Sequence, residues 1–290
     1  MLRIVVVLLC IGSAVRGGIL GSSSIKCGAS TSSKSFSLVN PSNPPNNCVY
    51  TVKPSSSKVC QIRLDFDEMT LAPPRSFNFT QCVDDYLEVG GYRFCGRESG
   101  QHIYIPFTGK SLPIRIVSTY RSLGSQLPWL SWRIQVRQLE CPKGLLTKGV
   151  SENYASISDN ELLAPSGCLQ YFLGTFGRIQ SFNFDQGRGT LNDNLTYAVC
   201  IRRTSETQGV RLFGENVQLG CDRVFRGDDF LLVPFGGFEG TFANSSMVWG
   251  SSLQNKSHVS KIPGPISLVA VIGNNRDRCF NRFSVRYELF

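Results

Sequence analysis

The stretch from Cys82 to Gly96 constrains the fold of this chain more than any other. It opens with a cysteine and an acidic pair, Asp84 and Asp85, continues as an alternating apolar segment, and closes at Cys95-Gly96. Such a segment is typical of a strand and its return loop, held by a disulfide, in an all-β extracellular domain. The stretch indicates the class of protein and says little about what that protein binds.

The cysteines point to an oxidising compartment. One of the eleven, Cys10, lies in an N-terminal segment with a basic start, a short apolar core and small residues after it. This pattern predicts a secretory signal peptide over residues 1–18. The other cysteines are widely spaced and form no Cys-x-x-Cys pair, which favours a disulfide framework over a zinc or thioredoxin site. We therefore expect a secreted, extracellular protein.

Length and a polar segment predict two domains. About 270 residues would remain after cleavage, more than a single domain usually contains. A polar stretch separates two cysteine-bearing blocks, and we place the domains at residues 19–141 and 165–290 with a linker at 142–164. In that linker Leu145, Leu146, Leu162 and Leu163 could pack against either neighbour. No later apolar run reaches the roughly 18 residues of a spanning helix, so we expect no membrane insertion.

Both blocks alternate apolar and polar residues with the period of β-strands. The alternation is clear over residues 60–66, 112–117, 132–137 and 283–289. A sustained helical period is absent, and turns rich in Pro, Gly, Ser and Asn separate the segments. The sequence therefore predicts an all-β chain of antiparallel β-sandwich domains.

Several motifs in both blocks are similar to those of the CUB-domain family. They are Cys168, Gly177-Arg178-Ile179-Gln180-Ser181-Phe182-Asn183-Phe184 and Tyr197-Ala198-Val199-Cys200 in the second block, and Cys27-Gly28, Asn47-Cys48-Val49-Tyr50, Cys82-x-x-Asp85-x-Leu87-x-Val89 and Phe94-Cys95-Gly96 in the first. As a whole the chain resembles secreted arthropod proteins with two CUB-like domains and no established activity. The resemblance implies two disulfide-stapled jelly-roll sandwiches in tandem, the second divergent.

The resemblance also implies a disulfide pairing. It joins Cys27 to Cys48, Cys82 to Cys95, and Cys168 to Cys200. Two further pairs are then left, Cys60 with Cys141 and Cys221 with Cys279. The last pair departs from the family, whose second loop closes at a Cys-Gly that the second block lacks. Spacing alone fixes no connectivity.

Calcium is the one metal that the resemblance suggests. Many CUB domains hold it with a glutamate and two aspartates, and Asp85 stands at one of these positions. Ala72 and Thr119 replace the other two acids. Calcium takes about six to eight oxygen ligands, so a single retained carboxylate should bind it weakly. We expect no metal and no other cofactor.

The chain offers few groups for catalysis. His102 and His258 are its only histidines, and neither stands in a metalloprotease or zinc-finger spacing. A Gly-x-Ser-x-Gly elbow and a glycine-rich phosphate loop are both absent from the sequence. We therefore predict that the chain is not an enzyme.

Sequons and charge suggest surface features. Four sequons are candidate sites of N-linked glycans, at Asn78, Asn194, Asn244 and Asn255. The alternative for Asn194, which stands close to a strand and to Cys200, is that it carries no glycan. The formal net charge is +9. Outward arginines would form a ladder suited to sulfate or carboxylate groups if their strands were neighbours in one sheet. These arginines are Arg63, Arg115, Arg133 and Arg137. The alternative is an ordinary basic surface.

Two function classes remain. The first is a non-catalytic recognition module that binds an extracellular protein or acidic glycan. The second is a structural component of a matrix or secreted fluid, in which the disulfides mainly resist proteolysis. Nucleic acid is not an expected partner, since no binding motif for it occurs.

Overall fold

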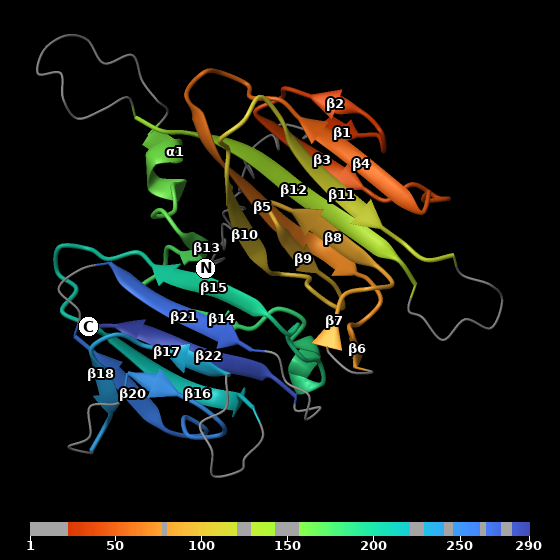
Figure 1. The fold of residues 1–290 in the computed structure, drawn as a ribbon. Coiled ribbons are helices and arrows are strands. Elements are labelled where there is room, and N and C mark those ends of the chain that lie inside the picture. The colour runs from red at the N-terminus through yellow and green to blue at the C-terminus, as the bar shows by residue number, and fades with distance from the viewer. Residues whose placement is uncertain are drawn as a thin grey trace, which may run out of the picture.

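The chain folds into two β-sandwiches that lie against each other (Figure 1). The computed structural model describes residues 23–76, 80–120, 129–142, 157–220, 229–240, 246–261, 265–273 and 280–290. We call the sandwich built from residues 23–140 the N-terminal sandwich and the one built from residues 168–289 the C-terminal sandwich. Each consists of two five-stranded sheets, and no sheet mixes strands from the two. The predicted all-β fold is confirmed.

The N-terminal sandwich stacks a sheet of order β1-β3-β12-β5-β10 on one of order β2-β4-β11-β8-β9. Its strands are β1 (Ser23–Ile25), β2 (Ser30–Thr31), β3 (Ser35–Val39), β4 (Asn47–Val52), β5 (Val59–Thr70), β8 (Tyr86–Val89), β9 (Tyr92–Phe94), β10 (His102–Pro106), β11 (Leu112–Val117) and β12 (Ser131–Glu140). A separate small hairpin joins β6 (Arg75–Ser76) to β7 (Thr80–Gln81). The β8–β9 hairpin is the strand and return loop that the opening motif predicted.

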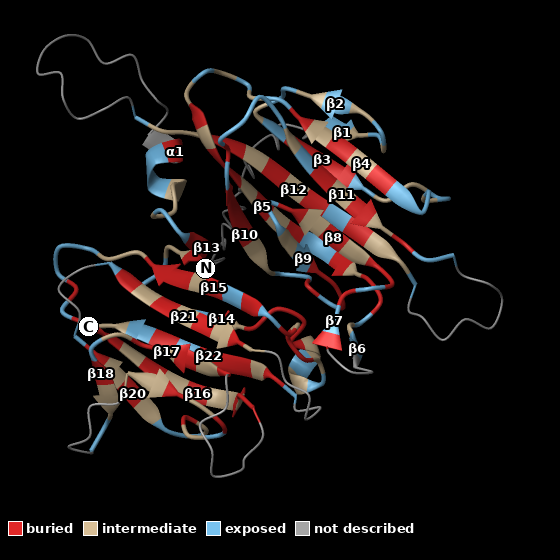
Figure 2. Ribbon diagram, in the orientation of Figure 1, coloured by how far each residue is buried: buried red, intermediate tan, exposed pale blue. Residues whose placement is uncertain are grey.

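Alternation explains why these segments pair as they do. On β5 the side chains of Ile62, Leu64 and Phe66 point into the sandwich and are at most 1 % exposed. The intervening positions face outward, as the striped burial of the strands shows (Figure 2). Trp132, also buried, reaches across the core, with its Nε1 3.4 Å from the hydroxyl of Tyr50 on the opposite sheet. Each such apolar side chain contributes about 1.5–3 kcal/mol when fully buried.

The C-terminal sandwich repeats this plan with a sheet of order β13-β15-β21-β17-β19 and one of order β14-β22-β16-β20-β18. Its strands are β13 (Cys168–Phe172), β14 (Phe176–Gln180), β15 (Leu195–Ile201), β16 (Val210–Gln218), β17 (Phe230–Leu232), β18 (Gly236–Phe238), β19 (Met247–Val248), β20 (Ser257–Ser260), β21 (Ile266–Ile272) and β22 (Arg282–Leu289). A 3-10 turn, η1 (Asp185–Gly187), precedes β15.

A short helix, α1 (Ile157–Leu162), lies in the segment expected to be a linker. The sequence analysis predicted no helix there. It packs against β12 of the N-terminal sandwich, and Leu162 and Leu163 join a small cluster with Tyr104 and Tyr171. The end of this segment is therefore bound to both sandwiches. Among the residues that the structure describes, no helix has the length and apolar character needed to cross a membrane.

Candidate functional site

The two sandwiches meet along a seam that contains several buried polar side chains, among them Glu98 and Asn183. We define the seam as the contact between residues 61–104 of the N-terminal sandwich and residues 159–196, which include the end of α1 and the first strands of the C-terminal sandwich. Strand β10, at the edge of its sheet, lies beside β13, at the edge of its own. Aromatic packing accompanies the strand contact, with the ring centres of Phe94 and Phe182 4.7 Å apart.

His102 joins these two edges. Its Nε2 lies 3.1 Å from the amide nitrogen of Tyr171, which donates to it, and 3.0 Å from the carbonyl oxygen of the same residue. The ring also packs edge-on against Phe172, with ring centres 5.0 Å apart. Burial and, secondarily, the charge of Arg63 lower the pKa of His102 to about 4. His102 thus begins a strand and lies in the seam, where its hydrogen bonds join the two sandwiches.

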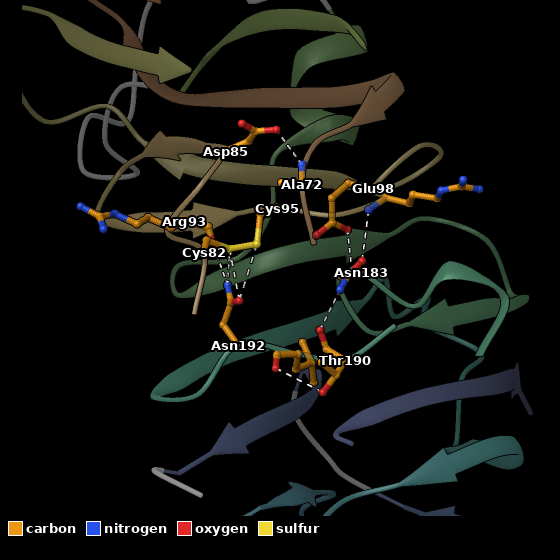
Figure 3. Close-up of a disulfide and its surroundings, with 11 residues drawn as sticks. Ala72, Cys82, Asp85, Arg93, Cys95, Glu98, Asn183, Thr190 and Asn192 are labelled. Carbon is orange, nitrogen blue, oxygen red and sulfur yellow. Dashed lines mark hydrogen bonds between the residues drawn. A yellow bond between two sulfur atoms is a disulfide. The ribbon is translucent and has the colours of Figure 1, made fainter. Parts of the chain in front are cut away.

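Glu98 and Asn183 form the polar centre of the seam (Figure 3). The carboxylate of Glu98, which is 1 % exposed, accepts the backbone N–H of Asn183 at 2.8 Å. The Asn183 amide accepts the N–H of Arg97 at 3.1 Å and donates to the carbonyl oxygen of Thr190 at 3.0 Å. Burial raises the pKa of Glu98 well above its ordinary value, and the Asn183 bond opposes this only in part.

This centre explains the glycine of the Cys95-Gly96 motif. Gly96 has φ +82, and a Cβ on it would stand 2.0 Å from Oδ1 of Asn183. The position therefore needs glycine both for its backbone conformation and for the close approach of the second sandwich. Gly96 and Asn183 are both motif residues, and nothing in the sequence signals that they would touch.

Further polar contacts run along the seam on both sides of Glu98. The Gln101 amide donates to the carbonyl oxygens of Gln180 and Ser181 at 3.2 and 3.1 Å. At one end, the N–H of Thr80 donates to the carboxylate of Asp193 at 2.7 Å, and the N–H of Asp193 donates to the carbonyl oxygen of Thr80 at 2.8 Å. Such buried bonds are directional, so they fix how one sandwich sits on the other.

The arginine ladder is contradicted. Arg63 and Arg137 do lie directly opposite each other on neighbouring strands. Arg115, however, is on β11 in the other sheet, where it donates to Asn47 at 2.8 Å and lies 4.0 Å from Glu88. Arg133 is exposed and stands opposite Glu68. The error arose because alternation shows that a side chain points outward but not on which sheet its strand lies.

The two arginines that do face each other are already paired. Arg63 holds Asp65 through two guanidinium nitrogens, at 2.6 and 2.9 Å, and donates to the Tyr104 hydroxyl at 2.8 Å. Arg137 donates to Asp159 of α1 at 2.9 Å, and Lys34 lies 2.6 Å from the same carboxylate. Burial alone would raise the pKa of Asp159, but these two cations outweigh it and lower the pKa overall. Both arginines therefore build the fold.

Four disulfides join the pairs Cys27–Cys48, Cys60–Cys141, Cys82–Cys95 and Cys168–Cys200. They match four of the five expected pairs. Cys221 and Cys279 lie outside the described residues, as do the segment 1–18 and the sequon asparagines Asn78 and Asn244. The Cys82–Cys95 bridge borders the seam, because Nδ2 of Asn192 lies 2.9 Å from the sulfur of Cys82 (Figure 3).

Asp85 serves the backbone. It is 1 % exposed and accepts the N–H of Ala72 at 2.8 Å through one oxygen and the N–H of Thr119 at 2.8 Å through the other. The structure thus brings together the three positions that the calcium comparison named. A carboxylate already held by two N–H donors has less to offer a cation. In the described part of the chain, no group of three or more His, Cys, Asp or Glu side chains could hold a metal ion.

A groove opens where the seam reaches the surface beside the β8–β9 hairpin. It has a volume of about 510 Å³, within the range of about 300–1,000 Å³ typical of ligand sites. It is bordered by the N-terminal sandwich on one side and by the start of β15 on the other. Its lining includes Gln81, Tyr92, Arg93, Asn192, Asn194 and Thr196. A second hollow of about 370 Å³ lies farther along the seam, next to Cys60, Cys141 and Cys168.

The two described sequon asparagines are both exposed but differ in their surroundings. Asn194 and Asn255 have left-handed backbone conformations, with φ of 56 and 55. Asn194 lines the groove, whereas Asn255 lies between β19 and β20 in the chain, outside the seam, and its N–H donates to the carbonyl oxygen of Gly214 at 2.9 Å. His258, the second histidine, is fully buried on β20 against Phe238.

The fold has counterparts among solved structures. No curated protein matches the chain. The solved CUB1-EGF-CUB2 domains of rat MASP-1 align with 91 % of this chain and 99 % of theirs, at 10 % identity and a TM-score of 0.32. The same domains of human MASP-1/3 align with 89 % of this chain and 100 % of theirs, at 13 % identity and a TM-score of 0.30. The extracellular region of zebrafish Gpr126/Adgrg6 aligns over 92 % of this chain and 37 % of its own, at 10 % identity and a TM-score of 0.30.

The family comparison is more specific. It concerns the second block, which the sequence analysis regarded as the more divergent of the two. Residues 165–287, which include nearly the whole C-terminal sandwich, match the model of the animal CUB domain.

Proposed function

We propose that this chain is a secreted, non-catalytic recognition module that binds an extracellular protein or acidic glycan. The observation that carries the proposal is the match of residues 165–287 to the animal CUB domain, because CUB domains are extracellular interaction modules. In this proposal residues 1–18 are a signal peptide, and residues 19–141 form a first CUB-like domain that the linker 142–164 joins to a second, at residues 165–290. The likeness to secreted arthropod pairs of CUB-like domains belongs to the same proposal.

The seam supports a role that needs fixed geometry. Glu98, Asn183 and Gln101 make buried hydrogen bonds between the sandwiches, and α1 is bound to the N-terminal sandwich through Asp159. A module whose halves are held in this way presents its loops to a partner at a constant angle, and little conformational entropy is lost on binding. Catalysis requires a nucleophile or acid–base group beside an open site. His102 and Glu98 are instead largely buried, and their hydrogen bonds serve the seam.

A saturation experiment tests the proposal. The full chain is expressed in secreting animal cells, labelled, and added at increasing concentration to the surface of the source tissue, with and without an excess of unlabelled protein. We expect saturable, competed binding and one dominant cross-linked partner. The reduced and alkylated protein, which loses its disulfides, is the control and should not bind. Linear, uncompeted binding would contradict the proposal.

The structural alternative has one observation in its favour. Four disulfides and a polar seam would protect the chain from proteases whether or not it binds a partner. Retention of the intact protein in secreted material, together with the absence of any saturable partner, would favour it.

A further inference from the structure

The groove beside the β8–β9 hairpin has the chemistry of a carbohydrate site. Its lining offers one aromatic ring, Tyr92, among the amides of Gln81 and Asn192 and the hydroxyl of Thr196. A sugar ring places its C–H face on an aromatic ring and its hydroxyl and acetamide groups on amides. There is also room at the rim, because a Cβ added to Gly91 would meet nothing within 4 Å.

A sequon is part of this lining. Asn194 and Thr196, its first and third residues, are both exposed and both border the groove. Asn194 stands at the turn into β15 with φ 56, a conformation that asparagine tolerates better than most residues. A glycan attached to Asn194 therefore starts at the wall of the groove, whereas one on Asn255 starts on open surface.

Covalent attachment of a glycan to Asn194 favours its binding in the groove even if the individual contacts are weak. A group tethered by a short flexible link has an effective concentration in the millimolar range at a site that it can reach. A free sugar in the surrounding fluid would have to exceed that concentration to compete. The groove and its sequon belong to the same molecule, so its own glycan is the favoured occupant.

We propose that an N-linked glycan on Asn194 lies in this groove, with its first sugars against Tyr92 and Gln81. It would cover the open end of the seam and touch both sandwiches at once. The inference rests on the proposed function only in requiring passage through the secretory pathway. It also implies that a partner binds elsewhere on the module.

Resistance to an endoglycosidase tests this, with Asn255 as an internal control. The secreted full chain is treated with the enzyme while folded, and release from each asparagine is followed by site-resolved mass spectrometry. We expect release from Asn194 to be at least tenfold slower than release from Asn255, and the two to be equal after reduction and denaturation. Equal rates on the folded protein would overturn the inference.

Two variants separate docking in the groove from simple crowding near the surface. Gln81→Ala, at an exposed position, and Tyr92→Ala, with folding checked by thermal melting, should each speed release from Asn194 and leave release from Asn255 unchanged. If Gln81→Ala leaves both rates unchanged and a folded Tyr92→Ala does too, the glycan does not lie in the groove.

Occupancy distinguishes failure of this inference from failure of the proposed function. Secreted protein that carries a glycan at Asn255 and a bare Asn194 overturns the inference alone. Protein that stays in the cell with both asparagines bare contradicts secretion as well, and with it the proposed function.

Discussion

The substitution Arg137→Gln isolates the ion pair between α1 and the N-terminal sandwich, and Arg133→Gln is its matched control. Both residues lie on β12, four positions apart, on the same outward face. Arg137 donates to the buried carboxylate of Asp159, whereas Arg133 is exposed. The two substitutions remove the same charge and most of the same side chain, so the difference between them reports the pairing.

The structure sets the size of the effect. The Asp159 side chain is fully buried, and Arg137 and Lys34 at 2.9 and 2.6 Å are the cations that hold it. Removing the partner of a buried charge typically costs about 3–5 kcal/mol. Lys34 remains, and the Arg137 side chain is 35 % exposed, so solvent screens part of the interaction. We therefore expect Arg137→Gln to lower the free energy of unfolding by about 1–3 kcal/mol, and Arg133→Gln by no more than about 0.5 kcal/mol.

Chemical and thermal unfolding of the full chain measure this difference. For a protein of this size, the stated loss corresponds to about 3 to 10 °C in the melting temperature. Hydrogen exchange should also rise in residues 157–162 of the Arg137 variant and not in the Arg133 variant. Equal stability of the two variants would refute the reasoning, because it would mean that Asp159 gains nothing from Arg137.

The remaining predictions concern charge, pH and metal. The mature protein should leave a heparin column at or below physiological ionic strength, because Arg63 and Arg137 are paired and Arg115 is on another sheet. This result would favour a protein over an acidic glycan as the partner, and elution well above that ionic strength would favour the glycan. Burial lowers the pKa of His102 from 6.5 to about 4, so the unfolded chain takes up a proton at a higher pH than the folded protein does. The free energy of unfolding is therefore highest above pH 6.5 and falls by up to about 3 kcal/mol as the pH falls toward 4. The difference in free energy of unfolding between the protein and His102→Gln should therefore shrink or reverse between pH 6.5 and 4. Glu98 contributes in the opposite direction, but it is present in both proteins and cancels in the difference. A difference that stays constant with pH would contradict the lowered pKa. Millimolar calcium or chelator should leave the melting temperature unchanged within about 1 °C, because both oxygens of Asp85 accept backbone N–H groups; a shift of several degrees would reveal a site that uses other ligands.

The sequence predicted the parts of the fold that depend on local period. The alternating segments at 60–66, 112–117, 132–137 and 283–289 are all strands in the structure. Such segments need only neighbouring residues to specify which face is buried. The Cys82–Cys95 loop could also be predicted, because its disulfide and its hairpin lie close together in the chain.

The seam could not be predicted, because it depends on residues far apart in sequence. Tyr104 occupies an outward position on β10 and would be assigned to the surface, yet it is 1 % exposed because the C-terminal sandwich and the α1 segment cover it. Asp159 looks like an ordinary acid in a polar segment until β12 supplies its partner. The expected arginine face was lost because Arg115 lies on the other sheet. Arg63 and Arg137 are paired with Asp65 and Asp159.

The position of the last strand has a consequence for synthesis. The N-terminal sandwich is complete once β12 and Cys141 have left the ribosome, because β12 pairs with both β3 and β5. The C-terminal sandwich is complete only after β22 has been synthesised, because β22 is an interior strand of its sheet and pairs with both β14 and β16. At about 5–20 residues per second, the interval is roughly 7 to 30 s. During that time the completed C-terminal sandwich does not yet cover Tyr104 and Phe94. The nascent chain therefore exposes an apolar surface that favours aggregation and that a chaperone could bind.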